Sequence, residues 1–274
     1  MKTHVRVCVI GGGVVGCSVL YHLTKLGWTD VMLVERSELT SGSTWHAAGG
    51  FHTLNGDTNM AALQGYTIRL YRELEELTGM SCGLHHVGGV TLADTPERFD
   101  MLKAERAKHR FMGLETEILG PQEIKAIAPV TNIDGVLDDP LDGHLDPSGT
   151  THAYARAARM AGAEIELHTR VRETTPRADG GWDVVTDKGT IRAEHVVNAG
   201  GLWAREVAAM AGCYLPLHPM EHQYLVTEDL PEIYERDSEH PHVMDPGGES
   251  YLRQEGRGLC IGFYEQNAQP WAVD

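Results

Sequence analysis

Basic residues are scarce in this sequence, and their scarcity argues against one class of partner. Lys and Arg number 23 against 39 Asp and Glu, which gives a formal net charge of −16 at pH 7. The affinity of nucleic-acid-binding proteins depends on Lys and Arg side chains that neutralise phosphates. We therefore expect no nucleic-acid partner.

Long hydrophobic runs and targeting signals are also missing from the sequence. No apolar stretch reaches the roughly 18 residues that a membrane-spanning helix requires, so no membrane span is expected. The N-terminus leads directly into a predicted strand, so we expect neither a signal peptide nor a transit peptide.

Cysteine is sparse, and none of the five cysteines forms a C-x-x-C pair. This usage is typical of free thiols in a reducing compartment, the cytoplasm or, in a eukaryote, the mitochondrial matrix. Cys8 and Cys17 are expected to be packing residues. Cysteine and histidine also lack the spacing of zinc ligands, so no metal site is predicted. His240 and His242 lie in a polar stretch and are expected to be solvated.

The first 35 residues contain the most informative pattern. An apolar run over residues 5–10 predicts a strand, residues 14–26 have helical character, and residues 31–34 predict a second strand that ends in Glu35. The turn between the first strand and the helix has the spacing G-x-G-x-x-G. Strand, glycine-rich turn, helix and acidic residue together form the dinucleotide-binding fingerprint.

Each part of this fingerprint has a physical role. Gly11 allows the tight turn, Gly13 lets a pyrophosphate approach the backbone, and Gly16 lets the helix and strand pack closely. The helix N-terminus, at Val14 and Val15, offers free N–H groups to phosphates. Glu35 can accept hydrogen bonds from the ribose hydroxyls of the adenosine.

The loop Ser41–Gly50 indicates which dinucleotide is bound. Small residues and hydroxyls persist in it for about ten positions, which suits a backbone lying along a long, flat cofactor, with Ser43 and Thr44 donating to phosphates. A second segment, residues 195–203, reads as a strand that ends in small residues. Together these segments favour FAD over NAD.

The pattern along the chain predicts an α/β fold with two interleaved domains. One is a Rossmann-like, three-layer FAD-binding domain made of residues 1–86 and 146–214. The other is a mixed-sheet α+β substrate domain made of residues 87–145 and 215–274. Its second part is expected to be truncated, because the chain ends soon after the predicted strand 259–263.

Several motifs carry a resemblance that covers essentially the whole chain. The sequence resembles the glycine-oxidase-like FAD-dependent amine oxidoreductases, the DAO family, and within them the dimethylglycine and sarcosine dehydrogenases and oxidases. The segment from Ser43 to Gly49 is the most specific of these motifs. The others are the glycine-rich turn, Glu35-Arg36, residues 197–201, 219–224 and 251–255.

The resemblance implies roles for individual residues. It implies covalent attachment of the flavin 8α-methyl group to His46, contact of Val171 with the adenine, and positions for His222 and Tyr251 beside the flavin. Tyr251 is matched across a loop of different length. His52 is taken as an unmarked loop histidine. The predicted cofactor-binding residues are Gly11, Gly13, Val14, Val15, Gly16, Glu35, Arg36, Gly42, Ser43, Thr44, Trp45, His46, Val171 and Gly200.

The function implied is oxidation of the N-methyl group of a small glycine-type amine, dimethylglycine or sarcosine, by hydride transfer to the flavin. The predicted catalytic residues His222 and Tyr251 would assist deprotonation of the amine. The electron acceptor would be oxygen or an electron-transfer flavoprotein. Two alternatives stay open: a non-catalytic, flavin-binding regulatory module, and an oxidase of another amino acid on the same fold. Relatives run much longer, and many carry a folate-binding module to which nothing here corresponds.

Overall fold

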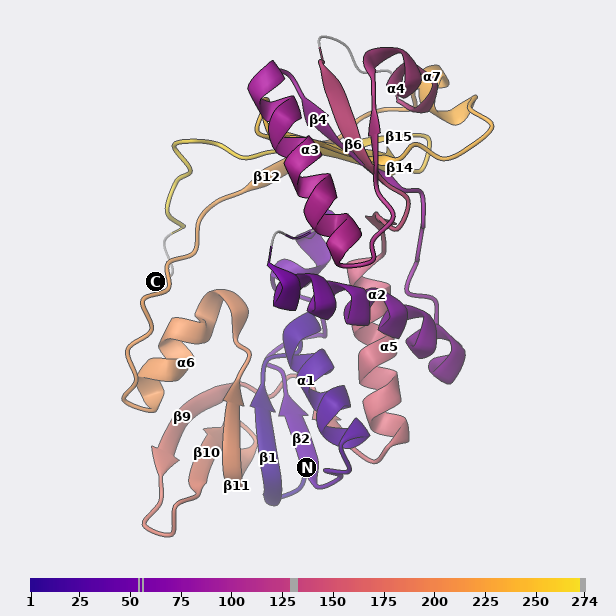
Figure 1. Cartoon of the computed structure of the whole chain (residues 1–274). Coiled ribbons are helices and arrows are strands. Elements are labelled where there is room, and N and C mark those ends of the chain that lie inside the picture. The colour runs from indigo at the N-terminus through magenta and orange to yellow at the C-terminus, as the bar shows by residue number, and fades with distance from the viewer. Residues whose placement is uncertain (54, 56, 129–132, 272–274) are drawn as a thin grey trace.

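The computed structural model describes residues 1–53, 55, 57–128 and 133–271. Two large sheets lie at opposite ends of the molecule, with helices between and around them (Figure 1). Residues 272–274, where the predicted truncation falls, lie outside the described residues. None of the helices in the described part of the chain is both long enough and apolar enough to cross a membrane.

Six strands form the first sheet. They are β1 (His4–Ile10), β2 (Val31–Val34), β8 (Glu164–Glu166), β9 (Val171–Pro176), β10 (Trp182–Thr186) and β11 (Gly189–Asn198). Their order is β8-β2-β1-β11-β10-β9; the first four run parallel, and β10 is antiparallel to both of its neighbours, β11 and β9. β2 is buried along its whole length, as expected for a parallel strand covered on both faces.

Helices cover both faces of this sheet. The main core joins the sheet to three helices, α1 (Val14–Lys25), α2 (Thr58–Thr78) and α5 (Pro147–Met160). On the other face, α6 (Ala204–Met210) packs against a second cluster that contains Cys8. The side chain of Asp146 caps α5 by accepting a hydrogen bond from the backbone N–H of Ser148. Cys8 and Cys17 are buried packing residues, as predicted.

Seven strands form the second sheet. They are β4 (Gly89–Ala93), β5 (Glu117–Leu119), β6 (Gly135–Asp139), β12 (Gln223–Val226), β13 (His242–Asp245), β14 (Ser250–Glu255) and β15 (Gly258–Phe263). Their order is β12-β15-β14-β13-β4-β6-β5, with only the β13–β4 pair parallel. The fold is therefore α/β with a parallel-sheet unit and a mixed-sheet unit interleaved along the chain, as the sequence predicted.

Two helices pack on opposite faces of the second sheet. α4 (Pro121–Ile127) inserts Ile124 into one apolar cluster, and α3 (Pro96–Phe111) inserts Leu102 into another. Val136 belongs to the first cluster and Leu137 to the second, which shows the alternation of side chains along β6. Following the strand pairing from Leu137 through Thr91 and Met244 places Tyr251 on the same face as α3.

Short elements connect the two sheets. They are η1 (Ser43–His46), β3 (Gly50–Phe51) and β7 (Gly143–His144). Of the other short elements, η2 (Gly201–Trp203) follows β11 of the first sheet, and α7 (Pro231–Tyr234) lies between β12 and β13 of the second sheet. β3 pairs with β7, and His144 also pairs with His85 in an antiparallel bridge. This places the loop after η1 next to two of the crossings between the sheets, the one at His85 and the one at His144.

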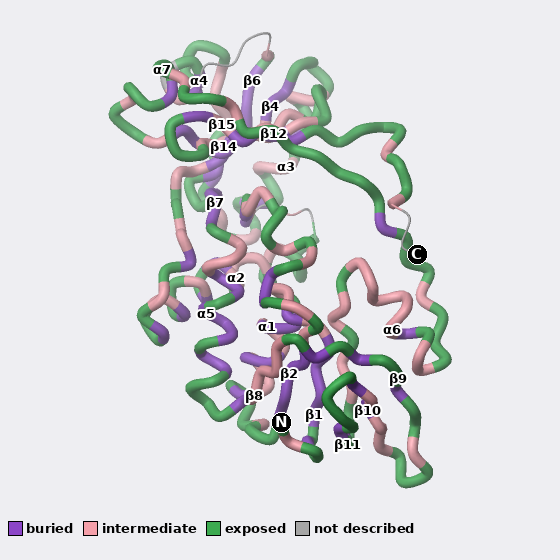
Figure 2. The backbone as a smooth tube through the Cα atoms, turned by 180° about the vertical axis from the view of Figure 1, so that it is seen from behind, coloured by how far each residue is buried: buried purple, intermediate pink, exposed green. Residues whose placement is uncertain are grey.

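The prediction of solvated histidines at 240 and 242 is wrong. Each side chain is only 2% exposed, because residues 242–245 form β13 in the interior of the second sheet. Figure 2 shows the opposite situation along the connection between α6 and β12, where exposed residues dominate. The local polarity of residues 239–245 therefore gave a wrong prediction, because strands that are distant in the sequence bury this segment.

Candidate cofactor and substrate site

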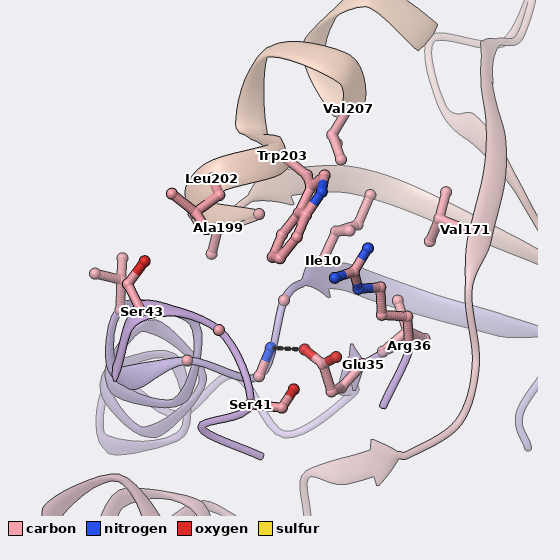
Figure 3. Close-up of a pocket in the computed structure, with 18 of the residues that line it drawn as sticks. Ile10, Glu35, Arg36, Ser41, Ser43, Val171, Ala199, Leu202, Trp203 and Val207 are labelled. Carbon is pink, nitrogen blue, oxygen red and sulfur yellow. Dashed lines mark hydrogen bonds between the residues drawn. The ribbon is translucent and has the colours of Figure 1, made fainter. Parts of the chain in front are cut away.

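A cavity of about 840 Å³ opens at the carboxyl ends of β1 and β2, beside the glycine-rich turn (Figure 3). This edge of a parallel sheet is where α/β proteins bind nucleotides. The predicted cofactor residues that line it are Gly11, Gly13, Val14, Val15, Glu35, Arg36, Gly42, Ser43, Thr44, Val171 and Gly200. Gly16, Trp45 and His46 are not among the described residues in its lining.

The glycines keep the turn close to the neighbouring backbone. Gly11 has φ +115°, and a Cβ there would overlap the carbonyl oxygen of Ala199. A Cβ on Gly16 would overlap the carbonyl oxygen of Gly11. Gly16 therefore serves the packing of α1 against the turn, while Gly11 and Gly13 border the cavity itself.

The N-terminus of α1 points its free backbone groups at this cavity. Its N-cap residue is Gly13, which has no side chain to satisfy them. The N–H of Val14 donates to Oγ1 of Thr44 at 3.0 Å, and the side chain of Val15 is 63% exposed. Because Thr44 Oγ1 accepts this bond, its own hydroxyl proton is available to a phosphate oxygen. The donors fit a pyrophosphate.

Two backbone groups fix the carboxylate of Glu35 at the cavity rim. Oε2 accepts a hydrogen bond from the N–H of Gly12 at 2.7 Å, and Oε1 accepts one from the N–H of Ser37 at 2.8 Å. A carboxylate has about four acceptor positions, so two remain for ribose hydroxyls. The geometry suits the role that the sequence predicted.

Trp203 is a cavity residue that the prediction left out. The guanidinium carbon of Arg36 lies 3.6 Å from the centre of its ring, and both side chains face the cavity (Figure 3). Val171 lines the same end. A flat aromatic wall at this position suits a planar ring system. The sequence marks the segment 195–203 by its small residues, but nothing in the local sequence indicates that the side chain of its last residue, Trp203, faces the cavity.

His46 lies at the end of η1, on the surface and just beyond the cavity lining. Its Nδ1 is 3.1 Å from the carbonyl oxygen of Gly42, and its ring lies 3.8 Å from that of Trp45. A carbonyl can only accept, so Nδ1 carries the proton in the neutral ring and Nε2 has a free lone pair. Nε2 is therefore the nitrogen suited to attack an electrophile.

His222 and Tyr251, the two predicted catalytic residues, both lie beside Tyr264. The ring of Tyr264 stacks on His222 with centroids 5.0 Å apart, and it lies 5.7 Å from the ring of Tyr251. Nδ1 of His222 is 3.6 Å from a carboxylate oxygen of Glu265. Tyr264 was not predicted, because only the pairing of β12, β15 and β14 brings these residues together.

The protonation state of Tyr251 limits what it can do. Burial raises the pKa of its phenol to about 12, so the hydroxyl stays protonated near neutral pH. Tyr251 can therefore donate a hydrogen bond but is a poor proton acceptor. His222, which is half exposed, is the better acceptor of the pair.

A buried polar network lies behind this group. His52, expected to be an unmarked loop histidine, holds Asp142 through its Nδ1 at 2.7 Å, and its ring is 4.8 Å from that of His242. Burial lowers the pKa of His242 to about 3, so this imidazole is neutral. A Cβ on Gly50 would lie 2.9 Å from its Nε2. His242 therefore packs directly against the strand that follows the η1 loop.

Comparisons with known proteins agree with this geometry. The family model described as "FAD dependent oxidoreductase" (DAO) matches residues 6–273. The chain is 43% identical to rat mitochondrial dimethylglycine dehydrogenase and 40% identical to human mitochondrial sarcosine dehydrogenase. These matches cover 96% and 97% of this chain but only 31% and 30% of the relatives. The chain thus spans about a third of their length.

A solved structure supports the same fold. The chain resembles the crystal structure of L-proline dehydrogenase from P. horikoshii, with a TM-score of 0.86 and 28% identity. The similarity covers 96% of this chain and 70% of the other.

Proposed function

We propose that this chain, which belongs to the DAO family of FAD-dependent oxidoreductases, is the FAD-binding part of an enzyme that oxidises the N-methyl group of dimethylglycine or sarcosine. The observation that carries the proposal is the cavity at the end of β1 and β2. There the N-terminus of α1, the fixed Glu35 and the Arg36–Trp203 pair face the same space. The choice of an N-methyl amine is supported by the 43% identity to dimethylglycine dehydrogenase.

Each part of the cavity suits one part of FAD. The N–H groups of α1 and the hydroxyl of Thr44 would hold the pyrophosphate, and Glu35 would hold the adenosine ribose. Val171 and Trp203 would enclose the adenine end. When bound, the flavin would supply a hydride acceptor, a chemistry that amino-acid side chains do not provide.

The residues on the second sheet would prepare the amine. Hydride loss from the N-methyl carbon requires a free electron pair on nitrogen, so the ammonium form must first lose a proton. His222 would take that proton, and Tyr251 would donate a hydrogen bond that orients the substrate. The iminium product then adds water and releases formaldehyde and the demethylated amine.

The proposal also covers the covalent linkage of the flavin, the electron acceptor and the cellular location of the protein. Nε2 of His46 would attach the flavin covalently, because its neighbour Nδ1 is the protonated nitrogen. The electrons would pass to an electron-transfer flavoprotein or to oxygen. Because the names of the relatives place them in mitochondria, the matrix is the proposed location in a eukaryote and the cytoplasm in a bacterium.

Anaerobic reduction of the purified chain tests the proposal. The protein should be yellow, and dimethylglycine and sarcosine should bleach it with release of formaldehyde, whereas glycine, the matched amine without an N-methyl group, should not. Bleaching by L-proline but by neither N-methyl amine would contradict the substrate assignment. A yellow protein that no amine bleaches would indicate a regulatory module, and a colourless one that binds NAD would overturn the cofactor assignment. Repeating the turnover in air, with and without an electron-transfer flavoprotein, identifies the acceptor.

A further inference from the structure

We propose that His85, His144 and Glu239 bind a divalent transition-metal ion of the zinc class at the point where the chain crosses between the two sheets. The three side chains come from separate segments and lie outside the cofactor cavity. Their donor atoms lie within 4.8 Å of one another. The proposal is independent of the proposed enzymatic function.

The backbone holds the two histidines together. The N–H of His85 donates to the carbonyl of His144 at 2.8 Å, and the N–H of His144 donates back at 3.1 Å. In an antiparallel pair this exchange places both side chains on the same side. Their rings stack with centroids 4.6 Å apart and an angle of 10° between the planes.

Glu239 reaches this pair from the segment before β13. Its Oε2 lies 2.8 Å from Nδ1 of His85, and its Oε1 lies 2.9 Å from Nε2 of His144. A carboxylate only accepts, so both of these nitrogens carry protons when no ion is bound. When an ion binds at these two nitrogens, each neutral ring changes tautomer, so that its single proton lies on the opposite nitrogen.

The donor set indicates the class of ion. Two imidazole nitrogens and a carboxylate suit zinc and its neighbours, whereas magnesium and calcium prefer oxygen ligands alone. Two ligands of a tetrahedral zinc with ~2.0 Å bonds are roughly 3.3 Å apart, so the rings must turn out of their parallel stack to converge. A cavity of about 290 Å³ lined by His85 and Glu239 gives room for that movement and for a water ligand.

Other charges near the site have both signs. Asp237 and Arg236 line the cavity beside Glu239. Arg253 is another nearby cation, and its guanidinium is paired with Glu255 at 2.6 Å. The carboxylates of Glu239 and Asp237 therefore offset the positive charge that would otherwise repel a metal ion.

Binding would join three strands of the connecting region. His144 pairs with His85 on one side and with Gly50 of β3 on the other. Gly50 follows the η1 loop that ends at His46. An ion bound to His85, His144 and Glu239 would thus stabilise two of the crossings of the chain, at His85 and His144, and the strand behind the cofactor loop.

Zinc titration of the untagged, EDTA-treated protein tests this proposal. A Cys213→Ser background removes the one exposed thiol that could compete among the cysteines. Calorimetry should show about one ion per chain, and zinc should raise the melting temperature while calcium should not. His85→Ala and Glu239→Gln should each weaken zinc binding by at least about tenfold, because a three-ligand site loses one ligand. His86→Ala, which removes the adjacent histidine, should bind zinc like the parent.

Two results would overturn the metal site. One is equal zinc affinity in the parent, His85→Ala and Glu239→Gln. The other is that the parent protein does not bind zinc, and that His85→Ala and Glu239→Gln each lower the melting temperature by the same amount with and without zinc. The second result would show that Glu239 only accepts hydrogen bonds from the two histidines. His85 is exposed, so its replacement leaves the core intact and keeps the test interpretable.

Discussion

The phenol ring of Tyr251 lies directly over Gly262 of the neighbouring strand. The two residues are paired in the β14–β15 ladder, and a Cβ at position 262 would overlap Cζ and Oη of the tyrosine. Only a glycine leaves the ring this close to the sheet. Gly262 is therefore a positioning residue for Tyr251, although it carries no chemistry of its own.

Replacing Gly262 should move the ring and slow the reaction while leaving the flavin bound. We expect Gly262→Ala to lower kcat/KM for dimethylglycine by about tenfold, the effect of one misplaced hydrogen bond of ~1.4 kcal/mol. Overpacking should also reduce the free energy of unfolding by about 1–3 kcal/mol. Steady-state kinetics and denaturant titration measure the two effects.

A double-mutant cycle separates positioning from general damage. If Gly262 acts through Tyr251, adding Gly262→Ala to Tyr251→Phe should cause little further loss of kcat/KM. Full additivity of the two losses would contradict the positioning role. Gly65→Ala is a matched control, because a Cβ there meets only the flexible end of Arg69 at 3.5 Å.

His222 should control the pH dependence of flavin reduction. We expect His222→Gln to slow reduction by dimethylglycine by about 10²–10⁴-fold and to remove the acidic limb of the pH profile, because the proton acceptor is lost. Tyr251→Phe should slow reduction but keep the limb, since its phenol stays protonated. Stopped-flow reduction across pH measures both. Glu265→Gln, which removes the nearby carboxylate but keeps the imidazole, is the control; an unchanged rate in His222→Gln would refute the role.

His46 should decide whether the flavin survives acid precipitation. In the parent protein we expect the flavin to stay with the polypeptide, and in His46→Ala we expect acid to release it, because Nε2 is absent. Mass spectrometry of the denatured chains measures the linkage. Trp45→Phe, which keeps a ring beside His46, should remain covalently flavinylated. Flavin retained on His46→Ala would identify another residue as the attachment point.

Local patterns in the sequence were sufficient for the nucleotide-binding half of the fold. The turn at Gly11, the helix after it and the acid at Glu35 are all set within one βαβ unit, and the structure places them together. The cap of α5 by Asp146 is equally local. Such features depend on neighbours only a few residues away, so a single sequence contains them.

Features that depend on strand pairing could not be found in this way. Tyr264 meets His222 and Tyr251 only because β15 lies between β12 and β14. His242 is buried because β13 lies between β14 and β4, although its own segment is polar. Glu239 meets His144 across 95 positions of the chain. Amino-acid composition and motif spacing therefore do not predict these contacts.

The buried carboxyl group of Asp139 gives the connecting region a pH dependence. Asp139 accepts hydrogen bonds from the hydroxyl of Thr53 and the N–H of Leu141, and it lies beside Asp142, which His52 holds. Burial, and then the charge of Asp142, raise the pKa of Asp139 to about 7. For His52, burial lowers the pKa, but the hydrogen bond and the charges of Asp142 and Asp139 raise it overall.

The contribution of Asp139 to the stability of the protein should therefore fall as pH rises from about 4 to 7, whereas His242, whose pKa is lowered, contributes a slope of the opposite sign below about pH 6.5. In this window folded Asp139 keeps a proton that the unfolded chain has released, so the folded state binds more protons and loses stability with rising pH. His52 adds a slope of the same sign above about pH 6.5, because its folded pKa is also raised. We expect Asp139→Asn to remove the Asp139 part of this dependence and to raise the free energy of unfolding at pH 8 by about 2–4 kcal/mol, because the amide oxygen can still accept from the N–H of Leu141 and the amide N–H can donate to the hydroxyl of Thr53, without a buried charge. At pH 4.5 the variant should be no more stable than the parent.

Denaturant titrations between pH 4.5 and 8 measure the difference in the free energy of unfolding. Asp134→Asn, at an exposed position, is the control and should leave the pH profile of stability unchanged. A stability gain in Asp139→Asn that is the same at every pH would show that this carboxyl group is ionised throughout and that its burial, not its protonation, limits stability.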